Sequence, residues 1–201
     1  MFSSTTTHDD AACFRLFLAG DDDAFAALFD RYNQRLYVYC HKFTGDAAKA
    51  ADLTQELWER VIRLRTAPQE VRNPGGFFLR IARNLCLNSA KRERRSMPLD
   101  DLPDSEHPAQ TERSELEEAI EEGLSRLSFE YREVLVLNAY CGYRFEEIAA
   151  MLGKRPETIW MRASRARAQL RKEVVELVGL HHTAQHAPVP NRDTRLSEKL
   201  Q

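Results

Sequence analysis

Apolar residues recur at helical spacing along most of the chain. In the first such stretch they follow one another at intervals of three and four, the period of a single helix face. The stretch comprises Ala24, Phe25, Leu28, Phe29, Tyr32, Leu36 and Tyr39. Asp22 or Asp23 precedes it and is expected to cap the helix, because a carboxylate there accepts hydrogen bonds from free backbone N–H groups. The pattern predicts a long amphipathic helix near the N-terminus.

Two further helices are expected in the first half of the chain. Gly45 interrupts the first helix, Asp46 can cap the second, and the apolar period then runs to about Arg65. Its apolar positions are Ala47, Ala50, Leu53, Leu57, Val61 and Leu64. Prolines and glycines next predict a loop, at Pro68, Pro74, Gly75 and Gly76. The following helix has apolar positions at Phe77, Phe78, Ile81, Leu85 and Cys86. These helices are expected to form one small bundle.

A second bundle is predicted in the second half of the chain. One helix has apolar positions at Leu116, Ile120, Leu124 and Leu127. Ser128 is expected to cap the next helix, which contains Val134, Leu135 and Leu137 and ends near Gly142. No apolar–polar alternation of strand length competes with these helices. The fold class is therefore expected to be all-α, with two small helical domains.

The composition agrees with a helical, globular protein. The chain has 201 residues, of which 43% are hydrophobic and 30% charged, and it contains only 8 Gly and 8 Pro. These values argue against wholesale disorder and against loop-dominated all-β folds. No apolar run approaches the roughly 20 residues that a membrane span needs, and acidic residues stand where a signal peptide has a basic segment. We expect a cytoplasmic protein without membrane insertion.

The charges are sorted into blocks, although the formal net charge is only −2. Residues 80–95 are basic, residues 100–122 are acidic and punctuated at first by prolines, and residues 154–172 are basic again. A single basic block is typical of a solvated helix face. Two such blocks on separate modules favour a polyanionic partner, and the acidic stretch between them predicts a flexible linker.

The clearest local motif is a helix-turn-helix between Arg144 and Lys172. A short helix, FEEIAAML, ends at Gly153, and Pro156 suits the first position of the next helix. In that helix one face is apolar, with Ile159, Ala163, Ala166 and Leu170. The opposite face presents Glu157, Trp160, Met161, Ser164, Arg165 and Ala168. The N-terminal half of such a helix enters the major groove of DNA. Arg144 and Arg155, which precede the two helices, are expected to contact backbone phosphates.

Cysteines and histidines give no sign of a metal site. Cys13, Cys40, Cys86 and Cys141 lie far apart in sequence, without a CxxC pair, and are expected to be buried small hydrophobic residues. His181, His182 and His186 cluster near the C-terminus in a segment typical of a tail. No cofactor is expected.

The ordered combination of these pieces resembles the sigma-70 family of bacterial RNA polymerase sigma factors, in its extracytoplasmic-function (ECF) subgroup. The stretch from LSFEYREVLVL to SRARAQLR resembles region 4. The pieces DDDAFAALFDRYNQRLYVYC, AADLTQELWERVIRL and FFLRIARNLCLNSAKRERR resemble region 2. The resemblance covers roughly residues 11–178. It implies a disordered N-terminus (1–10), a region 2-like domain (11–96), a linker (97–112), a region 4-like domain (113–178) and a tail (179–201).

The resemblance also implies partners and site residues. The helix with DLTQE would bind the β′ clamp helices of core RNA polymerase, through Asp52, Gln55, Glu56 and Glu59. The basic helix and the loop before it would contact the −10 promoter element, through Asn73, Arg80, Arg83, Asn84 and Lys91. The helix-turn-helix would read the −35 element, through Arg144, Arg155, Thr158, Trp160, Met161, Arg162, Ser164 and Arg165. The β flap of the polymerase and an anti-sigma factor are further expected partners. The linker either threads the polymerase or is a plain flexible tether.

Two other classes of function compete with a promoter-specificity subunit. A helix-turn-helix regulator would bind DNA by itself and use the first bundle to dimerise. The DLTQE helix and the basic helix ahead of an acidic linker favour the sigma factor instead. An enzyme is disfavoured because the sequence has no paired carboxylates with a plausible site, no Ser/His/Asp arrangement, no P-loop and no metal-ligand spacing. We therefore expect no catalysis by the chain itself.

Overall fold

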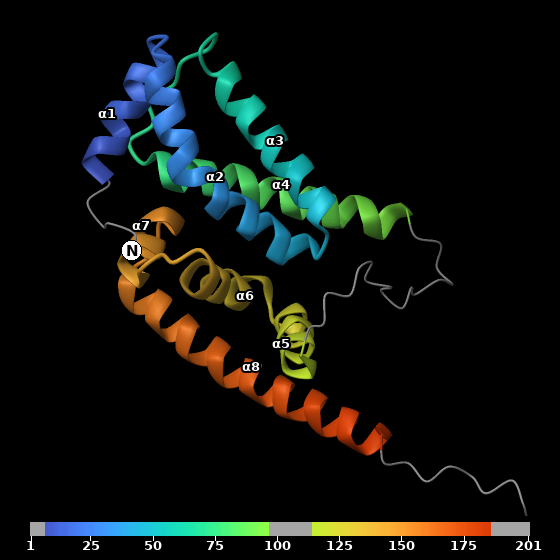
Figure 1. Ribbon diagram of the computed structural model, residues 1–201. Coiled ribbons are helices and arrows are strands. Elements are labelled where there is room, and N and C mark those ends of the chain that lie inside the picture. The colour runs from blue at the N-terminus through green and yellow to red at the C-terminus, as the bar shows by residue number, and fades with distance from the viewer. Residues whose placement is uncertain (1–6, 97–113, 186–201) are drawn as a thin grey trace, which may run out of the picture.

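The computed structural model describes residues 7–96 and 114–185, with side chains over residues 10–93 and 114–179. The described residues form α-helices and one short π-helix, without a strand. Helices α1 (Thr7–Leu18), α2 (Asp22–Thr44), α3 (Ala47–Arg63) and α4 (Pro74–Ser96) form a first unit. Helices α5 (Glu115–Arg126), α6 (Phe129–Leu135), η1 (Val136–Tyr140), α7 (Phe145–Leu152) and α8 (Pro156–Gln185) form a second. In Figure 1 the first unit lies above the second, and α8 runs along the lower edge.

The helix boundaries follow the capping chemistry of the sequence. Asp21, rather than Asp22 or Asp23, caps α2, because its carboxylate accepts a hydrogen bond from the Ala24 N–H at 3.0 Å. Gly45 ends α2 in the left-handed conformation, with a φ of 69° that favours glycine. Asp46 caps α3 as predicted. The expected boundaries at Gly45 and Asp46 are confirmed. The expected cap of α2, Asp22 or Asp23, was one or two residues too late.

The predicted loop before α4 is shorter than the sequence suggested. Pro74, Gly75 and Gly76 form the first turn of α4 instead of preceding it. Asn73 caps this helix, since its Oδ1 accepts a hydrogen bond from the Gly76 N–H at 2.8 Å. Proline is well suited to the first helical position because its missing N–H would have no intrahelical partner there. The helix that contains the expected −10 residues therefore begins directly after Asn73.

The two expected terminal segments also contain helix. Residues 7–10 belong to α1 rather than to a disordered terminus, and Asp10 is buried, where Arg31 and Tyr32 donate hydrogen bonds to its carboxylate. Helix α8 continues to Gln185, beyond the predicted start of the tail at residue 179. His186 and the linker of residues 97–112 lie outside the described residues.

The second unit is built as predicted around an amphipathic α8. Ile159, Ala163 and Ala166 are buried, and Gly153 ends α7 with a left-handed φ of 61°. Ser114 caps α5 in a capping box with Glu117. Ser128 stands at the expected cap position of α6, but its hydroxyl accepts no capping hydrogen bond.

One hydrophobic core extends through both units. Leu28, Trp58 and Phe78 of the first unit belong to the same buried cluster as Leu137 and Ile148 of the second. The sequence predicted two domains joined by a linker, and the structure packs them directly against each other along α2 and α4. We call this contact surface, between α2 and α4 of the first unit and α6, η1 and α7 of the second, the inter-unit interface. No helix among the described residues is long and apolar enough to cross a bilayer.

Candidate nucleic-acid and polymerase interfaces

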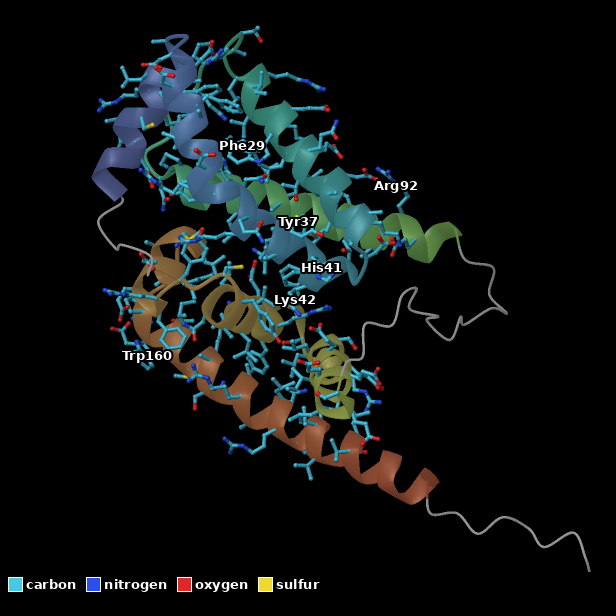
Figure 2. All side chains as sticks on the ribbon, viewed as in Figure 1. Phe29, Tyr37, His41, Lys42, Arg92 and Trp160 are labelled. Carbon is cyan, nitrogen blue, oxygen red and sulfur yellow. The ribbon has the colours of Figure 1, made fainter. Side chains whose placement is uncertain are left out.

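The N-terminal half of α8 presents an exposed apolar pair. Trp160 is 53% exposed and Met161 52% exposed, although large apolar side chains are usually buried. Figure 2 shows Trp160 at the outer side of α8, away from the first unit. The indole packs against the ring of Phe145, with 4.5 Å between ring centroids. This contact restricts the indole before any ligand binds. An apolar surface of this kind fits the methyl group of a thymine in the major groove.

The polar residues predicted on α8 divide between two sides. Ser164 and Arg165 are exposed beside Trp160 and Met161, as expected. Arg162 instead faces α6, where its guanidinium pairs with Glu130 at 2.9 Å and its side chain is only 19% exposed. Thr158 is half-buried. The structure thus separates Arg162 from the exposed face of α8.

Arg144 and Arg155 are exposed immediately before α7 and α8. Neither offers a side-chain acceptor for the helix that follows. Glu147 replaces part of the missing cap of α7, because its carboxylate accepts a hydrogen bond from the Arg144 N–H at 2.8 Å. The two guanidinium groups thus lie beside helix N-termini, where phosphate groups bind favourably.

Helix α4 has an exposed polar face in the first unit. Arg80, Asn84 and Lys91 are all exposed and follow one another at helical spacing. Asn88 lies between them on the same face and is also exposed. Asn88 was not among the predicted residues, although its position four residues after Asn84 places it on this face. The face combines two amides with two cations, a combination that suits a nucleic-acid strand.

The other two −10 candidates lie at the inter-unit interface. The Asn73 Nδ2 donates a hydrogen bond to the Ala150 carbonyl of α7 at 3.3 Å. Arg83 faces α6 from α4, and its Nε lies 3.4 Å from an Oε1 of Glu133. The structure therefore does not bring the five −10 candidates together on one open surface.

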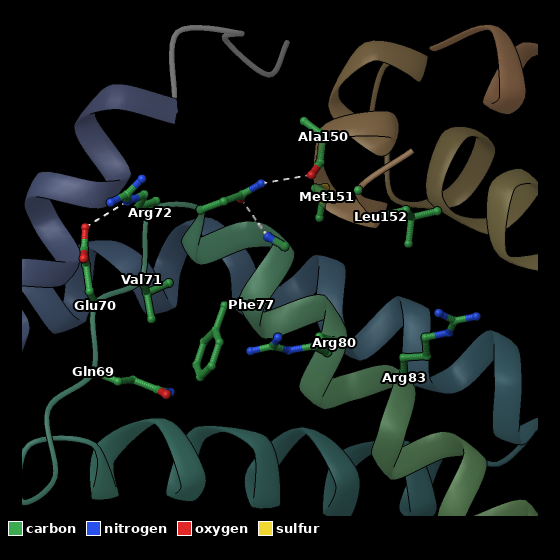
Figure 3. A pocket seen from close by; sticks show the side chains of 13 residues that line it. Gln69, Glu70, Val71, Arg72, Phe77, Arg80, Arg83, Ala150, Met151 and Leu152 are labelled. Atoms are coloured by element: carbon green, nitrogen blue, oxygen red, sulfur yellow. Dashed lines mark hydrogen bonds and ion pairs between the residues drawn. The ribbon is translucent and has the colours of Figure 1, made fainter. Parts of the chain in front are cut away.

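A cavity of about 450 Å³ opens between α4 and α7. Phe77, Arg80 and Arg83 line one side, while Ala150 and Met151 line the other (Figure 3). Arg80 lies over the Phe77 ring, 5.4 Å from its centroid. The cavity combines an aromatic surface with guanidinium groups, the elements that hold an unstacked base.

Glu133 is a buried charge that the sequence did not single out. Its side chain is 1% exposed, and its Oε1 accepts a hydrogen bond from the Tyr39 Oη at 3.0 Å. Burial raises the pKa of the Glu133 carboxyl above its ordinary value, against the opposing effects of Arg83 and of the Tyr39 hydrogen bond. We call Tyr39, Arg83 and Glu133 the Glu133 cluster. Glu133 stands beside Arg132 and near Glu130 in α6, and nothing in this local sequence distinguishes a buried carboxylate from an exposed one.

The predicted polymerase-binding residues share one exposed face of α3. Asp52, Gln55, Glu56 and Glu59 are exposed, while Leu57 and Trp58 are buried on the opposite side. The face is partly neutralised within the helix, since Arg60 pairs with Glu56 at 2.6 Å and Arg63 with Glu59 at 3.4 Å. Asp52 has no such pair in the described part of the chain. Its exposed carboxylate is therefore open to a basic partner.

The described residues contain no group of three or more His, Cys, Asp or Glu side chains that could hold a metal ion. Cys40, Cys86 and Cys141 are buried as expected, and Cys13 is half-buried. The Cys13 thiol donates to the Ala24 carbonyl at 3.2 Å, so it helps to join α1 to α2.

Comparison with known proteins agrees with this arrangement. Residues 28–96 match sigma-70 region 2, and residues 117–170 match sigma-70 region 4. BldN of Streptomyces coelicolor, an ECF RNA polymerase sigma factor, is 31% identical over 163 residues, which cover 76% of this chain and 62% of BldN. CarQ of Myxococcus xanthus, an RNA polymerase sigma factor, is 29% identical over 175 residues, which cover 80% of this chain and 95% of CarQ.

A solved structure shares the fold. The sigma factor RpoE of Bartonella quintana, in complex with the anti-sigma factor NepR, superposes with a TM-score of 0.56 at 23% identity, over 75% of this chain and 96% of RpoE. The chain belongs to the sigma-70 family of RNA polymerase sigma factors. Within that family it is an ECF sigma factor.

Proposed function

We propose that this ECF sigma factor directs core RNA polymerase to promoters through three separate surfaces. The exposed face of α3 binds the β′ clamp helices, α4 with its preceding loop binds the −10 element and assists opening of the duplex, and α7–α8 reads the −35 element. The observation that supports this most is the distribution of charge. Two cationic helix faces lie on different units, and an anionic face lies on a third helix. The chain serves transcription initiation as a binding subunit in the cytoplasm, without catalysis of its own.

The α3 face suits a basic protein partner. Asp52, Gln55, Glu56 and Glu59 offer carboxylate and amide oxygens on one exposed surface. The pairs Arg60–Glu56 and Arg63–Glu59 hold two of these carboxylates in fixed positions. Charge complementarity of this kind fixes orientation and speeds association. Asp52 and Gln55 are the members of the face that are not engaged in an i,i+4 ion pair.

The α4 face suits a single strand released from the duplex. An opened duplex loses base stacking, and a protein compensates by stacking bases on aromatic groups and by guiding the backbone with cations. Phe77 and Arg80 supply these groups at the cavity, while Asn84 and Lys91 continue the track along α4. Arg83 lines the same cavity, where its guanidinium lies beside Glu133.

The α8 face suits the major groove. Arg165 presents a guanidinium that can form two hydrogen bonds to a guanine edge, and Trp160 with Met161 offers apolar contact to thymine methyl groups. Arg144 and Arg155 bind phosphates at the two helix N-termini. Arg162 stabilises the packing of α8 on α6 instead of contacting bases.

An anti-sigma factor controls the chain in this proposal, and the β flap of the polymerase is the partner of the second unit. RpoE of Bartonella quintana is bound by an anti-sigma factor in its solved structure. The shared fold supports a similar partner here. A binding screen with the full chain would identify that partner.

Reconstitution with core RNA polymerase tests the function directly. Transcripts started from a random promoter library are sequenced, and we expect enrichment of two separated sequence elements. Replacing Asp52 and Gln55 together by alanine should weaken polymerase binding about tenfold, because both are exposed and free of i,i+4 ion pairs. The single change Glu118→Ala, at an exposed carboxylate of α5, is the control and should leave binding unchanged.

The same variants test the division of labour. Affinity of the full-length double variant for −35 duplex DNA should equal that of the wild type, since α3 and α8 lie in different units. An equal loss of polymerase and DNA binding would contradict the assignment of α3. Absence of start-site selection by the wild type would overturn the function itself.

A further inference from the structure

The second unit covers part of the surface assigned to the −10 element. Asn73 donates its side-chain hydrogen bond to the Ala150 carbonyl of α7. The guanidinium of Arg83 lies between Glu133 and the ring of Phe129, 4.9 Å from the ring centroid. Arg83 keeps 37% of its side chain exposed, so these contacts do not bury it but compete with contacts of the same groups to DNA. The arrangement thus sets the inter-unit interface in competition with −10 binding.

The interface holds charged groups within an otherwise apolar contact. Glu133 is buried at its centre, with Tyr39 and Arg83 as partners from α2 and α4. Arg132 crosses the interface nearby, since it donates a hydrogen bond to the Lys42 carbonyl and lies 5.0 Å from the centroid of the Phe43 ring. Withdrawing charged groups from water offsets much of what their pairing contributes. Such an interface separates at a lower free-energy cost than an apolar one of the same size.

Two open cavities flank the interface. The cavity of about 450 Å³ lies between α4 and α7. A second cavity, of about 320 Å³, lies further along α4, where Phe43 and Leu87 of the first unit face Phe129 and Arg132 of the second. Both cavities are open to solvent, so they are grooves beside the contact between the units and not voids within its core.

The other two proposed binding faces remain open in the same arrangement. Trp160, Met161 and Arg165 on α8 are exposed, and so is the acidic face of α3. Only the −10 surface is partly covered. The covering is thus selective for one of the three surfaces.

We propose that the structure is a closed state of the free chain, in which the Glu133 cluster withdraws Arg83 from the −10 surface and makes the interface separable. This inference rests on the proposed function, because it takes α4 as the −10 surface. Separation of the units releases Arg83 and Asn73 to DNA. A partner that binds the separated units, such as the polymerase, shifts the chain toward the competent state by mass action.

The closed state lowers the apparent DNA affinity of the free chain. When only a fraction of molecules is competent, the apparent Kd rises in inverse proportion to that fraction. A variant that opens the chain therefore gains affinity, although it adds no DNA contact. A gain in DNA affinity on opening therefore distinguishes a closed, masked chain from one in which the interface has no effect on binding.

Two interface variants of the full chain test it. Glu133→Lys places a cation beside Arg83 and should separate the units, with a larger radius of gyration in small-angle scattering and about tenfold tighter binding of a random single-stranded DNA pool. Glu118→Lys makes the same charge change at an exposed site of α5 and should alter neither value by more than about twofold. Circular dichroism confirms that each variant retains its helices.

The variant Arg132→Ala gives a sharper test. It removes a positive charge, so electrostatics alone predicts weaker DNA binding. Loss of its contacts with Lys42 and Phe43 should open the interface and strengthen single-strand binding instead. Arg126→Ala, at an exposed arginine of the same unit, is the control and should weaken binding slightly or leave it unchanged.

Two results would overturn the proposal. One is a wild-type radius of gyration already equal to that of Glu133→Lys, which would mean that the closed state is not populated. The other is expansion of both interface variants without a gain in DNA affinity over their controls, which would mean that the interface masks nothing. Neither measurement uses polymerase, so both outcomes are distinct from a failure of start-site selection.

Discussion

Helices α8 and α4 both present cationic surfaces suited to DNA, yet they differ in what covers them. On α8, Trp160, Met161 and Arg165 are exposed to solvent. On α4, Arg80 and Asn84 face solvent, while Arg83 faces Glu133 across the inter-unit interface. The residues of the first surface are ready to bind duplex DNA in the free chain. The second surface, on α4, becomes fully available to DNA only after the two units move apart.

The difference follows from the chemistry that each surface must perform. Reading an intact duplex needs a rigid helix face, and the contact between Trp160 and Phe145 supplies rigidity. Capturing a separated strand needs a larger surface, which would bind any single strand if it were always exposed. Covering part of α4 limits such binding without any change to α8.

The largest effect is expected for Arg165→Ala on the open surface. Loss of its guanidinium should reduce affinity for −35 duplex DNA by about 1–3 kcal/mol and relax preference at one base pair. The measurement is a base-by-base binding scan with the full chain. Val175→Ala, also exposed on α8 but ten residues beyond Arg165, is the control. A uniform loss across all sequences would reassign Arg165 to phosphate contact.

A smaller effect is expected for Gly76→Ala on the covered surface. A Cβ at Gly76 would lie 3.0 Å from the Met151 carbonyl oxygen of α7 and 3.1 Å from the Asn73 Nδ2, so these neighbours must give way by a few tenths of an ångström. We expect this crowding to loosen the contact between α4 and α7. Alanine also favours the helix of α4 itself. Hydrogen exchange should therefore become faster in α7 and no faster in α4. Gly179→Ala, where a Cβ meets no atom within 4 Å, should change neither. Slower hydrogen exchange in α7 would contradict the view that crowding at Gly76 loosens the inter-unit interface.

The smallest effect is expected from pH. Burial raises the pKa of Glu133 above the value of about 4.3 for an exposed carboxyl, so a proton binds more tightly in the closed state. This contribution to closure is fully present below the ordinary pKa and is lost as pH rises through the raised one. Tyr39, Arg83, Arg162 and Glu130 are the charged or titratable groups around it.

Scattering across a pH series checks this sign. The wild type should become more compact as pH falls toward 5, since protonated Glu133 is buried at lower cost. Glu133→Gln keeps an acceptor for Tyr39 and does not titrate, so its compaction should depend less on pH. Equal pH dependence in both proteins would exclude Glu133 as the responsible group.

Most of the fold was predictable because each helix has its own local signal. Apolar spacing gave the faces of α2, α3 and α8. Gly45 marked the end of α2, Asp46 the start of α3 and Gly153 the end of α7. The predicted helix boundary was wrong where several possible capping residues follow one another. Asp21, Asp22 and Asp23 are chemically equivalent in sequence, and only the backbone conformation selects Asp21.

The candidate site was predictable on its exposed parts. The exposure of Asp52, Gln55, Trp160 and Arg165 follows from helix periodicity alone. Arg83 and Arg162 share the same type of side chain and the same helical context as exposed arginines. Their orientation depends on Glu133 and Glu130, which lie far away in sequence, and no local pattern reports such a partner.

The shared hydrophobic core makes the two halves of the chain interdependent in evolution. Tyr39 and Phe43 on α2 must fit Glu133 and Phe129 on α6, in addition to their own unit. A chimera that joins this first half to the second half of another sigma factor would lose that match. Its promoter preference would then change together with its resting shape, even where every DNA-contacting residue was preserved.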